Sequence, residues 1–93
     1  MMTLAEAAQL IDAPQRPAGD FTGVGTDSRT LKAGELFVAL EGPRFDGHDY
    51  LPAVAAAGAA GAVVRRAHPA LACLEVADPL AALGRLAAAW RGR

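Results

Sequence analysis

Two short polar loops carry most of the side chains that could do chemistry in this sequence. The first is the run TDSR at residues 26–29, and the second is the run GPRFDGHD at residues 42–49. Together they supply hydroxyl, guanidinium and carboxylate groups, an imidazole and a phenyl ring. These groups are suited to binding a small polar anion rather than to catalysing the cleavage of a bond in it. A strong strand candidate, residues 35–40, separates the loops, so we expect a ligand site at the ends of a buried strand.

The first loop has two interpretations. On residue types alone, a polar turn is favoured, because Asp and Ser side chains commonly bond nearby backbone N–H groups. In a binding site, Ser28 and the adjoining backbone would instead hydrogen-bond a uracil or ribose edge, and Arg29 would either meet a phosphate or form an ion pair that fixes the loop. Thr26 is assigned to the same candidate site. The preceding Gly23 and Gly25 do not make a dinucleotide-binding fingerprint, because Ser28 stands at the third glycine position and a turn follows.

The second loop contains the best candidate ligands for a phosphate and for an aromatic ring. Arg44 offers charge-assisted donors in a fork that matches the oxygens of a diphosphate. Phe45 could stack on a nucleobase, and filling the small core is at least as good an interpretation of a phenylalanine. Gly42 and Pro43 form a turn in either case. These four residues are assigned to the candidate site.

Asp46, Gly47 and His48 complete the candidate site. His48 stands beside the carboxylates of Asp46 and Asp49, a pattern that suggests a metal site or a catalytic dyad. A lone histidine without a second histidine or a cysteine at ligand spacing makes a poor metal site. We therefore expect His48 to order the loop as a hydrogen-bond donor, and we expect no metal site.

Motifs that bind nucleoside triphosphates are absent from these 93 residues. There is no G-x-x-x-x-G-K-[ST] phosphate loop and no carboxylate cluster suited to magnesium. We expect this chain to bind a substrate without catalysing, with no catalytic residue and no cofactor of its own.

The composition indicates one ordinary soluble domain. Of the 93 residues, 53% are hydrophobic and 20% are charged, and the formal net charge is −1. The lack of a basic surplus argues against a nucleic-acid partner. The single Cys73 fits a reducing compartment and lies in an apolar run, where a buried inert thiol is expected. Without a signal peptide or an apolar run of about 20 residues, we expect a cytoplasmic monomer with no membrane partner.

Capping signals predict three helices. Thr3 and Glu6 form a capping box before a helix that buries Leu4 and Ile11 on one stripe. Asp49 is expected to cap a second helix over residues 50–57, which a left-handed glycine at position 58 ends. A third helix is expected to begin at Asp-Pro, residues 78–79. Its expected core-facing residues are Leu80, Leu83, Leu86, Ala87 and Trp90.

Strands are expected at residues 35–40, 61–64 and 74–76, with a weak one at 21–26 that two glycines dilute. The strands at 36–40 and 62–64 flank a helix, so they should be parallel. The predicted fold class is α/β: a small three-layer-like sandwich with a mixed or parallel sheet and about three helices.

The order of these motifs closely resembles the amino-terminal domain of the Mur ligases of peptidoglycan synthesis. The resemblance is carried by DSR at residues 27–29, GELFVAL at 34–40 and RFDGHD at 44–49, and it covers essentially the whole chain. Within the family, RFDGHD and the ending WR at 90–91 favour the ligase that adds D-alanyl-D-alanine over the ligase that adds the third peptide residue. The other two motifs are shared by both.

The resemblance implies that residues 1–93 are the UDP-substrate-binding amino-terminal domain of a longer ATP-dependent ligase, with the Ser28 loop holding the uridine end of UDP-N-acetylmuramoyl-tripeptide. ATP, Mg²⁺ and the chemistry would belong to a central ATPase domain, the partner of this domain in the same chain, and to a carboxy-terminal domain. Two alternatives remain. One is the same domain of the third-residue-adding ligase, and the other is a stand-alone domain that docks a protein through its Leu4/Ile11 and Trp90 faces.

Overall fold

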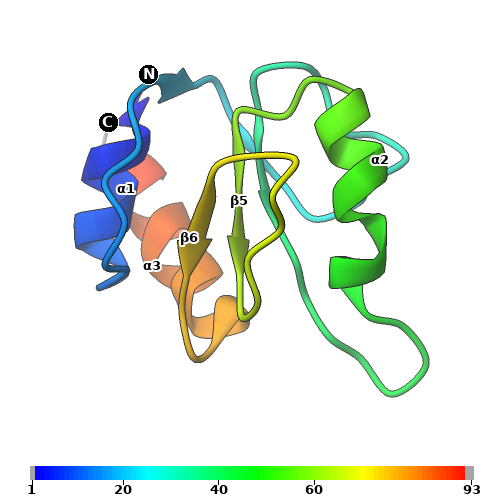
Figure 1. The fold of residues 1–93 in the computed structure, drawn as a ribbon. Coiled ribbons are helices and arrows are strands. Elements are labelled where there is room, and N and C mark those ends of the chain that lie inside the picture. Colours follow the sequence, from blue (N-terminus) through cyan, green and yellow to red (C-terminus); the bar gives the residue numbers. More distant parts are fainter. Residues whose placement is uncertain (1, 92–93) are drawn as a thin grey trace.

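The computed structural model describes residues 2–91, which fold around one parallel sheet (Figure 1). In chain order the elements are β1 (Met2–Thr3), α1 (Leu4–Leu10), β2 (Asp20–Phe21), β3 (Val24–Gly25), β4 (Leu36–Val38), the 3-10 helix η1 (Gly47–Tyr50), α2 (Leu51–Ala56), β5 (Gly61–Val64), β6 (Cys73–Glu75) and α3 (Pro79–Arg91).

The main sheet has four parallel strands in the order β3-β4-β5-β6, while β1 and β2 pair separately as an antiparallel ribbon. Leu36 lies opposite Gly61, and Val38 lies opposite Val63, which in turn lies opposite Leu74. The predicted parallel pairing is confirmed. Because all four strands run the same way, their carboxyl ends share one edge of the sheet, which we call the carboxyl edge.

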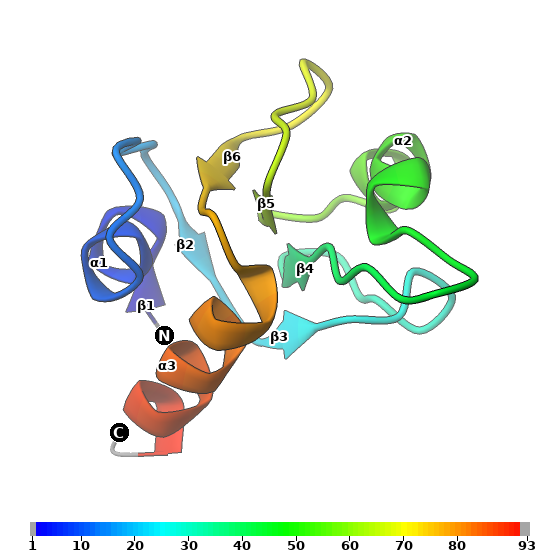
Figure 2. The same cartoon turned by 90° about the horizontal axis from the view of Figure 1, so that it is seen from below.

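Side chains of the sheet alternate between two cores, one on each face. On β4, Leu36 and Val38 pack with α1 and α3, whereas Phe37 packs with α2. This is the two-residue period of a strand covered on both faces. Figures 1 and 2 show α1 and α3 on one side of the sheet and α2 on the other. The predicted three-layer α/β architecture is confirmed.

Helix α1 begins at the predicted capping box. The Thr3 hydroxyl accepts from the Glu6 backbone N–H at 3.0 Å, and the Glu6 carboxylate accepts from the Thr3 backbone N–H at 3.2 Å. Leu4 and Ile11 are both buried against the sheet. This face of α1 is therefore used inside the domain and offers no surface to a protein partner.

The weak strand predicted at residues 21–26 is two strands. Phe21 belongs to β2 and pairs with β1, whereas Val24 belongs to β3 and pairs with β4. Between them the Thr22 N–H donates to the Gly34 carbonyl at 3.0 Å as the chain passes from one sheet to the other. Gly23 lies at this break, as glycine often does where a strand bends.

The second helical segment begins earlier than predicted and with a different cap. Asp46, not Asp49, supplies the cap: its side chain accepts from the His48 backbone N–H at 2.9 Å and starts η1. Helix α2 then continues without a side-chain cap. The prediction for Asp49 is wrong because an aspartate bonds the N–H two residues on, and Asp46 reaches the first turn before Asp49 does. Gly58, with φ of 90°, closes the segment as predicted.

Helix α3 begins where predicted: Asp78 Oδ1 accepts from the Ala81 backbone N–H at 3.2 Å. Leu86 is buried, and Trp90 is half-buried with its ring stacked on Phe21 at a centroid distance of 5.4 Å. Leu80 is 65% exposed and Ala87 is also exposed, so the prediction of these two as core residues is wrong. Within residues 2–91, no helix is long and apolar enough to cross a membrane.

Candidate functional site

The loops with the candidate ligands meet at the carboxyl edge of the sheet. Residues 26–29 follow β3, residues 39–49 follow β4, and residues 65–66 follow β5. Ligands of open α/β sheets bind outside the carboxyl ends of the strands. The parallel order therefore delivers both predicted loops to the edge where a ligand site is expected.

A cavity of about 370 Å³ lies between the two predicted loops, and we call it the two-loop cavity. Residues 26–29 line it from the first loop and Phe45 and Gly47 from the second, while Phe37 and Tyr50 complete the lining. Small-molecule sites typically have volumes of about 300–1,000 Å³. Three aromatic rings, three hydroxyls and an ion pair are thus gathered in a space suited to a small ligand.

Arg29 is held by Asp27 within the first loop. Asp27 Oδ1 accepts from the Arg29 backbone N–H at 2.9 Å and from Nε at 3.1 Å, while Oδ2 pairs with Nη2 at 3.0 Å. The Arg29 side chain, followed by its backbone N–H, holds the pKa of Asp27 below its usual range. Of the two roles considered for Arg29, the ion pair that fixes the loop is the one the structure contains.

Thr26 and Ser28 line the two-loop cavity, and their hydroxyls have no hydrogen-bond partner among the described residues 2–91. Ser28 is half-buried and Thr26 is exposed. Because Arg29 and Asp27 satisfy each other, these two hydroxyls are the donors and acceptors that the first loop leaves for a ligand.

The second loop is a tight hairpin with Phe45 at its tip. Glu41 and Asp46 form an antiparallel bridge, and the Gly42 N–H donates to the Phe45 carbonyl at 2.8 Å. The Phe45 ring lies over Gly42, and the residue is 54% exposed. The alternative in which Phe45 fills the core is therefore wrong. The ring stands at the surface and lines the two-loop cavity.

Gly47 anchors this hairpin to the end of β4. Its N–H donates to the Leu40 carbonyl at 2.7 Å, and a Cβ at this position would come within 2.9 Å of Ala39 Cα. Only a residue without a side chain fits this approach of two backbones. Gly47 therefore contributes to the site by bringing the loop close to the sheet.

Arg44 and Pro43 are exposed at the turn of the hairpin and do not line the two-loop cavity. The Arg44 guanidinium has no ion pair or hydrogen bond among residues 2–91. The predicted residues that the structure brings together around the cavity are Thr26, Ser28, Arg29, Phe45 and Gly47. Those that it places beside it are Gly42, Pro43, Arg44, Asp46 and His48.

His48 joins the second loop to the loop after β5. Its ring is buried, with Nδ1 at 2.6 Å from Asp46 Oδ1 and Nε2 at 2.9 Å from the Arg65 backbone N–H. The Arg66 N–H also approaches Nε2, at 3.4 Å. A carboxylate only accepts and a backbone amide only donates, so these partners assign the neutral ring with its proton on Nδ1. The expected ordering role is present, and His48 accepts as well as donates.

Two arginines after β5 pair with two acids of the hairpin. Arg65 Nη1 lies 3.0 Å from Glu41 Oε1, and Arg66 Nη2 lies 2.8 Å from Asp46 Oδ2. Hydrogen bonds from the His48 backbone and ring, and then from Arg66, hold the pKa of Asp46 well below its usual range. These arginines brace the hairpin, a role that the sequence alone did not indicate.

Glu41, Asp46 and His48 bring three potential metal-ligand atoms within 4.8 Å of one another. Both ring nitrogens are already engaged, and each carboxylate faces an arginine. A cation would have to displace these partners to gain lone pairs. The arrangement favours an ion-pair network over a metal centre.

Tyr50 and Phe37 are cavity residues that sequence reasoning missed. Phe37 lies on the α2 face of β4, and Tyr50, which ends η1, is 46% exposed. Tyr50 follows directly after the polar run GPRFDGHD, so an exposed aromatic there was a detectable signal. Phe37 sits in the middle of an apolar run, which gave no such signal.

A second cavity of about 460 Å³ adjoins the first and shares Phe45 with it; we call it the hairpin cavity. Its lining comes from the hairpin, from Arg65 and from the start of α3, where Leu80 is exposed. Arg65 was detectable because it directly follows a parallel strand and must lie at the carboxyl edge. Leu80 was assigned to the core and lies here instead.

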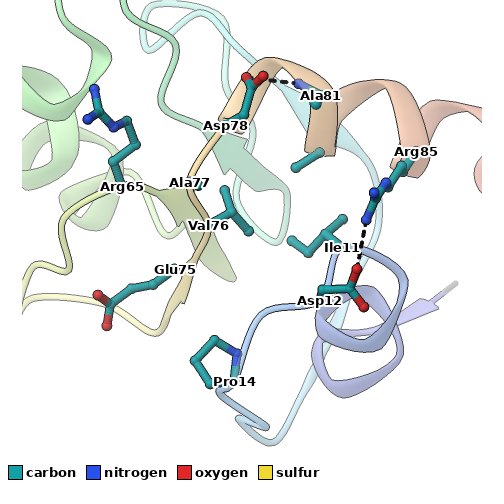
Figure 3. Close-up of a pocket in the computed structure, with 11 residues that line it drawn as sticks. Ile11, Asp12, Pro14, Arg65, Glu75, Val76, Ala77, Asp78, Ala81 and Arg85 are labelled. Carbon is teal, nitrogen blue, oxygen red and sulfur yellow. Dashed lines mark hydrogen bonds and ion pairs between the residues drawn. The ribbon is translucent and has the colours of Figure 1, made fainter.

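A third cavity, of about 540 Å³, lies between α1, β6 and α3 (Figure 3). Asp12 Oδ2 and Arg85 Nη1 form an ion pair at 3.0 Å across it, and Asp78 caps α3. Of its other charged residues, Glu75 bonds the Gln15 side chain, and Arg65 pairs with Glu41, which does not line this cavity. The predicted site residues lie in and around the two smaller cavities.

Cys73 is half-buried on β6, with its Sγ 3.3 Å from the His68 backbone N. Burial raises the pKa of the Cys73 thiol. A raised pKa keeps the sulfur protonated at neutral pH, which agrees with the inert role expected for it.

Comparison with known proteins places this architecture in a family. The family model described as "Mur ligase family, catalytic domain" matches residues 20–91. The chain is 37% identical over 84 residues to UDP-N-acetylmuramoyl-L-alanyl-D-glutamate–2,6-diaminopimelate ligase of Gloeobacter violaceus, covering 86% of this chain and 17% of that protein. It is 43% identical over 72 residues to UDP-N-acetylmuramoyl-tripeptide–D-alanyl-D-alanine ligase of Synechocystis sp., covering 73% of this chain and 16% of that protein.

The fold also matches solved structures. The UDP-N-acetylmuramoylalanyl-D-glutamyl-2,6-diaminopimelate–D-alanyl-D-alanyl ligase of Acinetobacter baumannii aligns with a TM-score of 0.83 and 36% identity, over 94% of this chain and 21% of that one. The chain therefore spans about a fifth or less of the length of these relatives. On the family match and these identities, the chain belongs to the Mur ligase family.

Proposed function

We propose that this chain is a substrate-binding module that holds the uridine diphosphate end of a UDP-N-acetylmuramoyl-peptide, within a cytoplasmic ATP-dependent ligase of peptidoglycan synthesis. The relatives are named for ligases that act on such substrates. The single observation that carries the proposal is the two-loop cavity: two polar loops, from different strands, close around one space at the carboxyl edge.

The lining of the two-loop cavity suits a pyrimidine nucleoside. Phe45 and Tyr50 expose rings on which a base can stack, and Phe37 forms an apolar part of the wall. Thr26 and Ser28 line the same space, and their hydroxyls, which have no partner among residues 2–91, can bond the polar edge of a base or ribose. Apolar walls with a few placed polar groups are typical of small-ligand sites.

Arg44 is the proposed partner of the diphosphate. Four arginines lie in the loops at this edge, and three of them already pair with a carboxylate: Arg29 with Asp27, Arg65 with Glu41 and Arg66 with Asp46. Arg44 has no such partner among residues 2–91, so it can bind phosphate oxygens without breaking an existing ion pair.

The proposed contribution to catalysis is remote binding. Holding the nucleotide end of a long substrate fixes the position of its far end, so that binding energy gained here lowers the barrier elsewhere. ATP and Mg²⁺ would bind to other domains of the parent ligase, since no phosphate-loop motif occurs in these 93 residues.

Among the ligases of the family, we propose the one that adds D-alanyl-D-alanine. The RFDGHD run and the Acinetobacter baumannii structures support this choice. The third-residue-adding ligase stays the second candidate, because curated relatives of that kind also match, including one from Streptomyces coelicolor at 39% identity. Assaying the parent enzyme with D-alanyl-D-alanine and with diaminopimelate separates the two.

The test of nucleotide binding is an NMR titration of the 93-residue chain with UDP and with uridine. UDP is expected to shift the amides of residues 26–29 and 42–48 and to leave most of α3 unchanged. Uridine should affect the first loop at higher concentration. Shifts confined to residues 65–68, or uniform small shifts, would contradict the proposed location.

A further inference from the structure

We propose that His48 is a positioning residue of this site: its neutral ring, protonated on Nδ1, ties the loop after β5 to the hairpin and so fixes Arg65 and Phe45 on the walls of the hairpin cavity. The inference rests on the proposed function in one respect, that a nucleotide binds at this edge. The two ring contacts, from Nδ1 to Asp46 and from Nε2 to the Arg65 backbone, are what we call the His48 joint, and they are present in the chain without a ligand.

One side of the ring is fixed to the hairpin. Nδ1 donates to Asp46 Oδ1 at 2.6 Å, and the same oxygen accepts from the His48 backbone N–H at 2.9 Å. Asp46 in turn bridges to Glu41, which closes the hairpin that carries Phe45. A change in the ring is therefore transmitted to the hairpin through a carboxylate with several partners.

The other side of the ring is fixed to the neighbouring strand. Nε2 accepts from the Arg65 N–H at 2.9 Å, across 17 positions of sequence. The His48 side chain is only 5% exposed, so water cannot easily replace the lost acceptor. A buried N–H left without a partner costs more than an exposed one. Arg65, which is one of the residues that line the hairpin cavity, is thus held in place by its backbone.

The joint requires the neutral ring. Protonation would place an N–H on Nε2 directly opposite the Arg65 N–H, and two donors cannot bond each other. The carboxylates of Asp46 and Glu41 lie 2.6 and 4.0 Å from Nδ1, and each of them is paired with a guanidinium group, Asp46 with Arg66 and Glu41 with Arg65. The Nε2 contact exists only in the neutral form.

The joint can be tested first in the free chain. The sequence has two histidines, and the second, His68, provides an internal comparison on the loop after β5. Long-range ¹H–¹⁵N NMR at pH 7.5 should assign the Nδ1–H tautomer to His48. The Arg65 amide should exchange slowly and lose that protection as the His48 ring becomes protonated. The opposite tautomer, or an unprotected Arg65 amide at pH 7.5, would overturn the joint.

Its role in binding is tested with two matched variants. In His48→Gln the amide oxygen can reach the place of Nε2 and accept from Arg65, whereas in His48→Asn the amide can reach only the place of Nδ1 and contact Asp46. The probe is UDP-N-acetylglucosamine, because its diphosphate is esterified at both ends. Free UDP carries a terminal phosphate that itself titrates near pH 6 and would confuse the pH profile.

We expect His48→Gln to keep the wild-type affinity at pH 7.5 within about threefold, and His48→Asn to lose roughly tenfold, the equivalent of one hydrogen bond near the top of its net range. Wild-type affinity should fall once acid protonates the His48 ring and removes the Nε2 acceptor. His48→Gln should lose that dependence, and the control His68→Gln should keep it. Circular dichroism should show folded protein for each variant.

Two results would overturn the proposal: wild-type affinity in His48→Asn, or an unchanged acid-dependent loss in His48→Gln. A wild-type chain that binds neither UDP nor the probe at pH 7.5 would contradict the proposed function and the positioning role together. In that case the tautomer and the Arg65 amide would still show whether the joint exists, so the two failures are distinguishable.

Discussion

The ring of Phe45 lies across the backbone of Gly42, so closely that a Cβ at residue 42 would come within 2.5 Å of Phe45 Cε1. The same two residues share a backbone hydrogen bond of 2.8 Å. This contact determines where the phenyl ring stands, and the ring lines both the two-loop cavity and the hairpin cavity. The absence of a side chain at residue 42 is therefore a requirement of the site.

Gly42→Ala is expected to displace the Phe45 ring from its present position. UDP binding should then weaken by about 1 kcal/mol, the lower end of what a base–aromatic stack contributes. Gly84→Ala is the matched control, because a Cβ there meets nothing within 4 Å and the residue lies inside α3. It should leave binding unchanged and stabilise the fold by about 0.5–1 kcal/mol. Isothermal titration and urea unfolding measure the two effects. Equal UDP affinity in both variants would contradict the role of the contact.

Arg44→Ala should weaken UDP binding far more than uridine binding, because uridine carries no phosphate. The expected loss for UDP is roughly 1.5–3 kcal/mol, the range for a hydrogen bond to a charged group. The loss should shrink as salt rises, since an exposed charge pair is screened. The comparison is best made by competition in the full-length ligase. Equal losses for UDP and uridine would remove Arg44 from the site.

Ser28→Ala serves as the counterpart of the arginine variant. If its hydroxyl contacts the base or ribose, UDP and uridine should both weaken, by roughly 0.5–1.5 kcal/mol, with little dependence on salt. The same competition assay measures both ligands. A loss seen with UDP alone would instead place Ser28 at the diphosphate.

Much of the fold could be predicted from the sequence, because the helix starts and ends depend on residues that are close together in the chain. The capping box of Thr3 and Glu6, the start of α3 at Asp78, and the left-handed Gly58 each depend on a few neighbouring residues. The two-residue β1 and β2 were not readable, since they exist only because the ends of distant segments meet. Leu80 was misplaced because helical spacing alone does not show where the sheet beneath a helix ends.

The candidate site was predictable as two loops, but not as a network. Parallel strand order brings residues 26–29 and 42–49 to one edge, and this follows from the alternation of strands and helices. Glu41 and Asp46 form ion pairs with Arg65 and Arg66, which follow them by 24 and 20 positions. The sequence alone does not show which acids two adjacent arginines after a strand will pair with. Tertiary contact, not local pattern, decides which charges pair.

Asp46 should make the free energy of unfolding depend on pH. The hydrogen bonds from His48, with the guanidinium of Arg66, hold its folded-state pKa well below that of an unfolded aspartate. The stabilisation is therefore complete above about pH 4 and is lost as pH falls below that value toward the folded-state pKa. Urea unfolding at pH 7, 5 and 3 should show a difference between wild type and Asp46→Asn that shrinks at pH 3. Asp20→Asn is the control, since the Asp20 side chain has no partner among residues 2–91. A difference that stays constant with pH would contradict the linkage.

Phe45→Ala should separate binding from stability. Phe45 is 54% exposed, so removal of its ring opens little buried space and should cost under about 1 kcal/mol of unfolding free energy. If a base stacks on it, UDP and uridine should both weaken by roughly 1–3 kcal/mol, independently of salt. Leu80→Ala is the matched control, because Leu80 is 65% exposed and lines the hairpin cavity but not the two-loop cavity. It should leave uridine binding unchanged. If the two variants bind uridine equally well, the base does not stack on Phe45, and Tyr50 becomes the remaining exposed ring in the two-loop cavity to test.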